Sequence, residues 1–209
     1  MIQYGLTRTV PPAEEPVSLT EAKLWCRVTH TAEDAQFEAA ITAAREICEA
    51  WTRRQFITAT WKMVMDRFDG SWYERWRGLP IFQSAGEGYH QLVRIPLPPL
   101  QSVSSVKYVH SQTGVLTTLD SELYRVDEVN EPGRLTPEFD EVWPDVRQVT
   151  NAVEVVFVAG YGSASAVPAS IKQAIKTLVA LWYVNREMPS ELPDGVKNLL
   201  RAVSYDEYR

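Results

Sequence analysis

The stretch from Asp34 to Arg54 limits the possible folds more than any other part of the 209-residue chain. Its apolar side chains recur every three or four residues, so they share one face of an α-helix. This face contains Phe37, Ile41, Ala44, Ile47 or Cys48, and Trp51. The charged side chains fall largely on the other side, at Glu38, Arg45, Glu46, Glu49 and Arg53. Because the stretch is also rich in alanine, a second helix can approach it closely. We therefore predict a core helix inside a bundle, with Thr31 as its N-terminal cap.

Helical patterns also occur on both sides of this stretch. Ser18 and Glu21 form the S-x-x-E pattern of a capping box, which predicts a helix that runs to about Val28. A later helix is predicted after Pro168, since proline suits the first helical turn, and a last short helix is predicted at residues 196–203. The apolar face of the later helix contains Ile171, Ile175, Leu178 and Trp182. We expect one shared core, with largely buried side chains at Ile41, Trp51, Leu178 and Trp182.

In the middle of the chain the apolar residues no longer follow the helical period. Short apolar segments with alternating character, separated by Gly, Pro and Ser, predict strands. They lie at residues 60–66, 92–95, 103–109, 115–119, 124–126, 134–135 and 153–158. Prolines at positions 11, 12 and 16 predict instead that the N-terminal residues are an extended lead-in without a regular element. Gly160 and Gly162 around Tyr161 predict a sharp turn after the last strand, not a phosphate-binding loop.

This order of helices, strands and helices predicts an α+β fold. The N- and C-terminal helices form a small bundle, and the strands form an inserted antiparallel β-sheet region. The predicted parts are an extended lead-in at 1–17, a helical part at 18–59, a β insertion at 60–162 with an aromatic loop at 71–88, and C-terminal helices with a tail at 163–209. The C-terminal helices are expected to pack with residues 18–59.

The overall charge argues against tight binding of nucleic acid. The net charge is −6, whereas a protein that grips DNA presents a basic face. Cys26 and Cys48 lie on separate predicted helices without the spacing of a metal site, which favours reduced thiols. The N-terminus lacks the apolar core of a signal peptide, and the strongest late apolar run, residues 178–184, is too short to span a bilayer. These features predict a soluble protein that is made in the cytoplasm and has no membrane partner.

Known catalytic motifs are missing or incomplete. The sequence has no G-x-S-x-G, P-loop, H-E-x-x-H or G-x-G-x-x-G pattern. Residues 104–107 match S-x-x-K, but they lie in a predicted strand and the companion motifs are absent. His30, His90 and His110 stand alone, so solvated or capping roles are favoured for them. One acidic group lacks the spacing of a calcium loop, so a solvated loop is favoured there. Its residues are Glu138, Asp140, Glu141 and Asp145. We therefore predict no catalytic residue, no metal and no cofactor.

An aromatic loop is the strongest candidate for ligand binding. Trp72, Tyr73 and Trp76 are interleaved with Arg75 and Arg77, and such side chains can stack on sugars or bases. They can equally pack on their own sheet or contact a neighbouring subunit or partner. The second interpretation is favoured. The alternative is a glycan-binding module that uses this loop.

An ordered set of short motifs carries a resemblance over most of the chain. They are P-V-S-L-T-E-A-K at 16–23, E-D at 33–34, I-T-A-A-R at 41–45, W-T-R-R at 51–54, I-P-L-P-P-L-Q-S-V at 95–103, Y-R-V at 124–126, W-P at 143–144, A-G-Y-G at 159–162, V-P at 167–168 and I-K-Q-A at 171–174. In this order they resemble the head–tail connector (adaptor, or head-completion) proteins of long-tailed bacteriophages, prophages and gene transfer agents. The resemblance runs from about Pro16 to Arg201. Residues 71–88 depart from it, because this segment is longer and more aromatic than the family's usual connection, so no role is carried over to them.

The resemblance implies a structural virion protein at the head–tail junction, not an enzyme. Such proteins form a closed ring of about a dozen copies under the portal protein of the filled head. The ring continues the channel, lets double-stranded DNA pass without specific binding, and receives the next connector or tail protein. The acidic net charge agrees with this role, since an acidic ring repels the DNA backbone and lets it slide. The alternative is then a glycan-binding module of a virion or prophage protein that uses the aromatic loop, and a virion enzyme is a third possibility.

The C-terminal segment is the predicted portal contact. The amphipathic helix at 196–203 follows two proline breaks and ends in a polar tail, so it gains stability mainly by docking on something else. The family's C-terminal region commonly engages the portal. Packing of this helix on its own bundle is the alternative. The predicted contact residues are Leu199, Leu200, Val203, Tyr205 and Tyr208.

Overall fold

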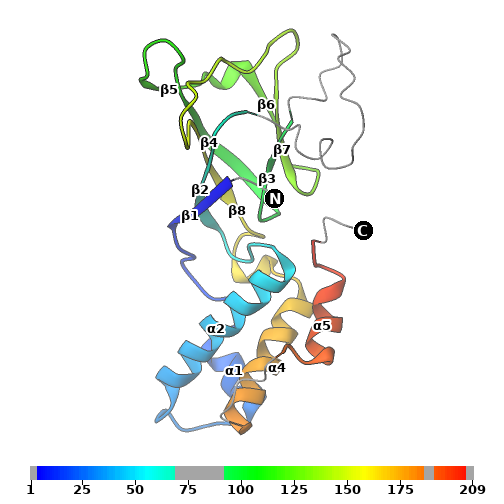
Figure 1. Ribbon diagram of the computed structural model, residues 1–209. Coiled ribbons are helices and arrows are strands. Elements are labelled where there is room, and N and C mark those ends of the chain that lie inside the picture. Colours follow the sequence, from blue (N-terminus) through cyan, green and yellow to red (C-terminus); the bar gives the residue numbers. More distant parts are fainter. Residues whose placement is uncertain (1–3, 69–91, 186–190, 206–209) are drawn as a thin grey trace. The chain divides into compact units, whose positions relative to one another are not determined.

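Two structural units share the chain, and each combines segments that are distant in the sequence. The structure is a computed structural model that describes residues 4–68, 92–185 and 191–205 (Figure 1). The β-unit is formed by Met1–Pro11 with Ala59–Ala159, and the helical unit by Pro12–Thr58 with Gly160–Arg209. Helices from both ends of the chain thus share one unit, and an antiparallel β-region is inserted between them in the sequence. This confirms the predicted α+β fold.

The helical unit is built around the contact between its two long helices. Its described α-helices are α1 (Leu19–Cys26), α2 (Asp34–Thr52), α4 (Ala169–Asn185) and α5 (Asp194–Arg201). α2 packs on α4, and α1 and α5 also contact α4. Ala44 of α2 and Ala174 of α4 are both fully buried, and their small side chains suit a close approach of helices. The larger buried side chains of this core include Phe37, Ile41, Ile171, Ile175, Leu178, Val196 and Leu200.

The helix ends agree only partly with the prediction. The Glu21 N–H donates to Ser18 Oγ (3.2 Å) and the Ser18 N–H donates to the Glu21 carboxylate (2.8 Å), which is the predicted capping box. α1 ends earlier than predicted because Arg27 adopts a left-handed backbone with φ of 58°. The predicted Thr31 cap is wrong. Glu33 is the N-cap residue of α2, and its side chain accepts no capping hydrogen bond, while the Thr31 carbonyl accepts the Asp34 N–H in the preceding turn.

Burial of α2 and α4 also differs from the prediction at particular positions. Arg45 is only 3 % exposed, although its charge suggested the outer side, because two carboxylates accompany it into the interior. Ile41 and Leu178 are buried as predicted. Trp51 and Trp182 are only half-buried, since both lie in the last turn of a helix, where fewer neighbours surround a side chain.

The β-unit contains a strand in every predicted strand region. These strands are β2 (Ala59–Met65), β3 (Val93–Ile95), β4 (Leu100–Val109), β5 (Leu116–Thr118), β6 (Tyr124–Asp127), β7 (Gly133–Pro137) and β8 (Val153–Ala159). They form two antiparallel sheets, with strand orders β1-β2-β8-β4-β5 and β3-β7-β6. Along β8, fully buried residues alternate with half-buried ones. This is the pattern of a strand with one face in the core.

The first strand, β1 (Tyr4–Val10), corrects the prediction of an N-terminal lead-in without a regular element. It pairs antiparallel with β2, with Tyr4 opposite Met65 and Arg8 opposite Trp61. The first prolines stand at positions 11 and 12, so they follow the strand and do not interrupt its hydrogen bonds. The strand depends on pairing with a segment distant in the sequence, which local composition does not reveal.

Gly160 and Gly162 form the sharp turn that the sequence predicts around Tyr161. Both glycines have positive φ, 126° and 114°. A side chain at Gly160 would place its Cβ 2.7 Å from the Ile57 carbonyl oxygen, so only glycine fits this backbone. The Tyr161 N–H donates to the Phe56 carbonyl (2.9 Å), which ties the turn to the segment after α2.

Candidate functional site

The described residues contain no cluster that supports metal chemistry. Across residues 4–68, 92–185 and 191–205, no group of three or more His, Cys, Asp or Glu side chains is placed to hold a metal ion. His110 Nδ1 instead accepts the backbone N–H groups of Gln112 and Thr113 (3.2 and 3.4 Å), a capping role. His30 lies 3.7 Å from the Glu33 carboxylate, and His90 lies outside the described residues. In the same ranges no helix is long and apolar enough to cross a membrane.

Both cysteines are free thiols in positions that lower their reactivity. Cys26 is half-buried and Cys48 is fully buried in the helical core. Burial, with a smaller contribution from Glu49, raises the pKa of the Cys48 thiol to about 12. A thiol with this pKa stays protonated near neutral pH, and the thiolate is the reactive form.

Cys48 should therefore not react with thiol reagents in the folded protein. At pH 8, about one Cys48 thiol in ten thousand is ionised, so Ellman's reagent should label at most Cys26 rapidly. In guanidinium chloride both thiols should react at once, which serves as the control. Rapid labelling of two thiols in native protein would show that α2 does not bury Cys48.

A buried electrostatic cluster around Arg45 has a structural role. Arg45 Nε lies 2.8 Å from Glu15 and Nη1 lies 2.7 Å from Glu49, and the Arg45 side chain is almost completely buried. Burial by itself would lower the pKa of the guanidinium, but the two carboxylates outweigh burial and raise it. Glu49 also accepts the Phe56 N–H (2.9 Å) and the Gln55 side-chain amide (2.7 Å), and Thr42 donates to Glu15 (2.9 Å). The cluster thereby fastens the middle of α2 to Glu15 and its C-terminal turn to the segment after the helix.

The predicted portal-contact residues divide into different environments. The Leu200 side chain is fully buried in the helical core, while Leu199 and Val203 pack against that core and remain half-exposed. The Tyr205 N–H donates to the Thr52 carbonyl (2.9 Å), and Tyr208 lies outside the described residues. Leu200 cannot meet a partner while α5 stays docked on this core. The portal contact itself stays a prediction.

The aromatic loop of Trp72, Tyr73 and Trp76 lies outside the described residues. Its proposed contact with a subunit, partner or glycan therefore stays a prediction.

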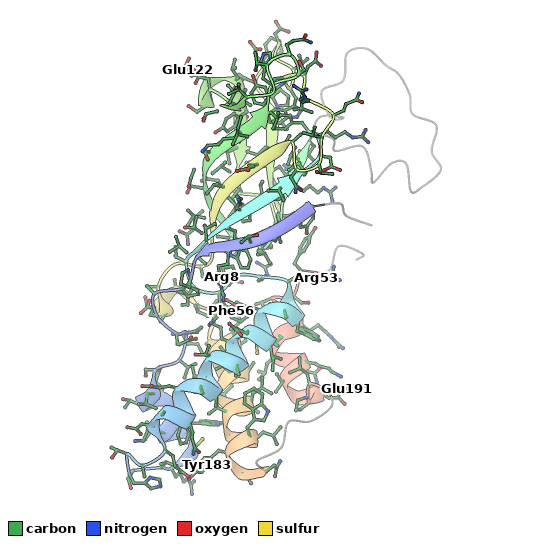
Figure 2. All side chains as sticks on the ribbon, turned by 60° about the vertical axis from the view of Figure 1, so that its left-hand side comes forward. Arg8, Arg53, Phe56, Glu122, Tyr183 and Glu191 are labelled. Atoms are coloured by element: carbon green, nitrogen blue, oxygen red, sulfur yellow. The ribbon has the colours of Figure 1, made fainter. Side chains whose placement is uncertain are left out.

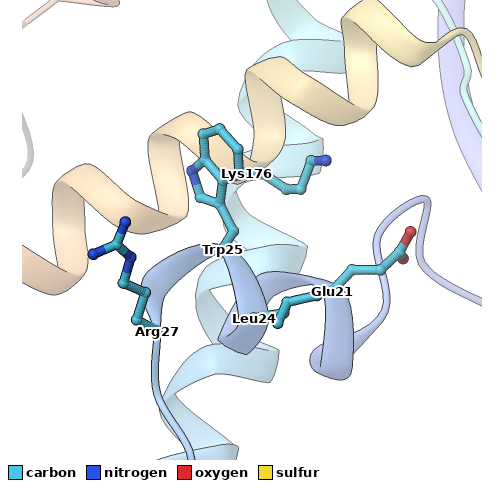
Figure 3. Close-up of a pocket in the computed structure, with 5 residues that line it drawn as sticks. All are labelled: Glu21, Leu24, Trp25, Arg27 and Lys176. Carbon is cyan, nitrogen blue, oxygen red and sulfur yellow. The ribbon is translucent and has the colours of Figure 1, made fainter.

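A basic groove lies between α1 and α4. It is lined by Glu21, Leu24, Trp25, Arg27 and Lys176 and encloses about 490 Å³. Figure 3 shows Trp25 rising from α1 toward α4, with Arg27 on one side and Glu21 on the other. Lys176 Nζ lies 5.4 Å from the centre of the Trp25 ring, within range of a cation–π contact. Leu24 is 78 % exposed and Trp25 is 50 % exposed. The groove thus combines apolar surface with cationic groups.

An acidic turn occurs in the β-unit after β7. It spans residues 138–142, with the sequence E-F-D-E-V, and lies next to a short 3₁₀ helix, η2 (Ser121–Leu123). Figure 2 marks this end of the β-unit with Glu122. Phe139 is 86 % exposed, and Leu123 and Val142 are also exposed. Among these carboxylates, Glu138 pairs with Arg125 (3.1 Å). The turn is therefore apolar and strongly acidic at once.

These surfaces were missed because the sequence patterns were used to find buried faces. In α1, apolar residues occupy Leu19, Ala22, Leu24, Trp25 and Cys26, which is more than one narrow face of a short helix can bury. This surplus is the signal that could have identified the groove. The acidic residues Glu138, Asp140 and Glu141 were weighed only as a calcium site, and Phe139 between them was not considered, although an aromatic side chain in an acidic turn can also make a protein contact.

Comparisons with known proteins find similarity in structure alone. No protein-family model and no curated protein matches the chain. A chain from the neck of an empty gene transfer agent (GTA) particle, computed with C6 symmetry, aligns with a TM-score of 0.72 and 20 % identity over 98 % of this chain and 97 % of that one. A chain from the virion of a native GTA particle aligns with a TM-score of 0.70 and 21 % identity over 98 % and 97 %.

A third chain gives the same result. It comes from the neck of a native GTA particle computed with C12 symmetry and aligns with a TM-score of 0.63 and 21 % identity, over 100 % of this chain and 98 % of that one. The alignments include both units and leave almost no part of either chain unmatched. The chain therefore has the fold of chains from the neck and virion of gene transfer agent particles.

Proposed function

We propose that this protein is a structural component of the head–tail junction in a phage-like particle or gene transfer agent. In this role it is an adaptor: a ring that joins the portal protein at the capsid vertex to the tail or to the next connector and continues the DNA channel. The observation that carries the proposal is the alignment over nearly the whole length of both chains with neck chains of GTA particles. A shared fold alone does not determine function, but here the motif order along the chain points to the same role.

A ring is the expected assembly. Two of the similar neck structures were computed with C6 and C12 symmetry, and a head-to-tail contact that closes on itself produces a ring. About a dozen copies fit this symmetry. The net charge of −6 supports a channel through which DNA slides, because a ring of acidic subunits does not retain the phosphate backbone. The proposed role needs no catalysis and no cofactor.

The C-terminal segment remains the proposed portal contact, with one change. Leu200 belongs to the core, so the available side chains are those of Leu199, Val203 and Tyr205, followed by Tyr208 beyond the described residues. Leu199 lies in the docked helix α5 and the other residues follow it, which gives the segment a fixed starting point from which to reach a partner.

The test is assembly on the portal. Purified protein mixed with the portal protein of the same particle should form rings at the portal in electron micrographs. Deletion of residues 204–209 should abolish this docking while it lowers stability by only about 1 kcal/mol, because it removes the bond between Tyr205 and Thr52. Absence of any portal complex with intact protein would refute the adaptor role. Undiminished docking of the shortened protein would refute only the C-terminal contact.

A further inference from the structure

The acidic turn and the basic groove are complementary in charge and in apolar content. The acidic turn (residues 138–142) presents Phe139 among carboxylates, whereas the basic groove presents Leu24 and Trp25 beside Arg27 and Lys176. The two surfaces lie on different structural units of the same chain. Each copy of the protein therefore carries both halves of a possible contact.

The acidic turn is held rigidly enough to act as a docking element. The Glu138 N–H donates to the Leu123 carbonyl (3.1 Å), and the Glu141 N–H donates to the Glu138 carbonyl (3.0 Å). The Phe139 N–H donates to the Glu138 carboxylate (3.1 Å), which also pairs with Arg125. Asp140 adopts a left-handed backbone with φ of 64° and closes the turn. These bonds hold the backbone around the exposed Phe139 in one conformation. Little backbone entropy is therefore lost when its side chain binds a partner, and such preorganisation favours binding.

The basic groove has room and a net positive charge for such an element. Its volume of about 490 Å³ is open to solvent. Glu21 is an ionised carboxylate in this lining, because hydrogen bonds from the Ser18 N–H and hydroxyl (both 2.8 Å) lower its pKa, with smaller contributions from Lys172 and Lys176. It offsets one of the two cations in the lining, Arg27 and Lys176, so one positive charge remains. Lys176 lies over the Trp25 ring, and Arg27 is exposed at the end of α1. An acidic segment with one aromatic anchor matches this lining.

We infer that the acidic turn of one copy docks in the basic groove of the next copy. Phe139 packs against Leu24 and Trp25, while Asp140 and Glu141 face Arg27 and Lys176. The contact joins two different surfaces, so it is heterologous and propagates from copy to copy, as a ring requires. The inference deepens the proposed function, since it names the partner surface of the ring, and it rests on that function for the context of the assembly.

The contact is small. One aromatic anchor with a few charges buries less than the roughly 1,200 Å² of a stable protein–protein interface. It is therefore weak between free subunits and becomes effective when copies are held side by side, since the local concentration then rises. A test must trap the contact covalently.

Disulfide trapping in the full-length protein supplies this test. The variants are Phe139→Cys and Leu24→Cys, each in a Cys26→Ser background, because Cys26 lies close to Leu24 in α1. Both replaced side chains are exposed, so the fold tolerates the changes. Under mild oxidation of concentrated protein, a mixture of the two variants should give a crosslinked dimer, whereas each variant alone should give little. A chain that carries both cysteines should give a ladder of oligomers on a non-reducing gel.

Val129→Cys is the matched control for the acidic turn. Val129 is 92 % exposed and lies in the turn between β6 and β7, outside the proposed contact. Mixed with Leu24→Cys, it should give only collisional crosslinking. Adding Glu141→Lys to the Phe139→Cys chain should reduce the dimer at least about tenfold, because like charges then meet. Lys176→Glu in the Leu24→Cys chain should restore it.

Equal yields from Phe139→Cys and Val129→Cys would overturn the inference, as would a crosslink confined within single chains. The charge variants also separate the inference from the proposed function. If trapping fails while the parent protein still assembles on its portal, only the contact is wrong. If trapping succeeds but the protein never docks on the portal, the contact stands and the adaptor role falls.

Discussion

Replacement of Arg45 by alanine should lower the free energy of unfolding by about 3 kcal/mol or more. The guanidinium is buried between Glu15 and Glu49, and the Glu49 side chain is itself only 11 % exposed. Removal of the cation leaves these carboxylates without the group that compensates their desolvation. The loss should appear as a lower midpoint in urea unfolding, followed by far-UV circular dichroism.

Glu38→Gln is the matched control for this variant. Glu38 lies on the exposed side of the same helix, so its replacement should change stability by less than about 0.5 kcal/mol. If Arg45→Ala and Glu38→Gln unfold alike, the buried cluster does not stabilise the helical unit. In that case α2 is held by the apolar core alone.

Leu200→Asp should destabilise the helical unit by about 4 kcal/mol or more, and it should release α5. Leu200 is completely buried beside the core residues of α2 and α4. The substitution removes a large apolar side chain from the core and places an unpaired carboxylate in its position. Release of α5 would also break the hydrogen bonds from Arg54 to the Val203 carbonyl and from Tyr205 to the Thr52 carbonyl. Urea unfolding should show an earlier midpoint, and limited proteolysis should cut near residue 194.

Asn198→Asp introduces the same group at an exposed position of the same helix. It should leave stability within about 0.5 kcal/mol of the parent. A Leu200→Asp protein that unfolds like Asn198→Asp would mean that α5 is not docked on its own bundle. That outcome would return Leu200 to the set of possible portal contacts.

Much of the fold was predictable because its elements are locally encoded. The Ser18–Glu21 capping box, the apolar periodicity of α2 and α4, and the alternation along β8 each depend on residues close in sequence. Such patterns identify the element and its buried face. The strand regions followed from the same reasoning, since each is bounded by turn residues.

The incorrect predictions have a common cause, which is contact between residues distant in the sequence. β1 was missed because its stability depends on β2, and Arg45 was placed outside because its neutralising partner Glu15 lies thirty positions away in the sequence. The interaction surfaces were missed for a related reason. A pattern shows which residues are apolar, but only packing decides which of them remain uncovered, as for Leu24 in α1 and Phe139 in the acidic turn.

The sequence by itself thus determined the α+β class, the positions of the helices and of the strands other than β1, and the resemblance that led to the proposal of a junction protein. These depend on local periodicity and on motif order, both of which are written along the chain. The tertiary structure alone decided that α5 is part of the helical core, that an ion cluster holds α2, and that an acidic turn and a basic groove are exposed on different units. These features depend on contacts between residues that are distant in the sequence. Such contacts decide which side chains are buried and which charges are paired, and the local sequence does not identify them.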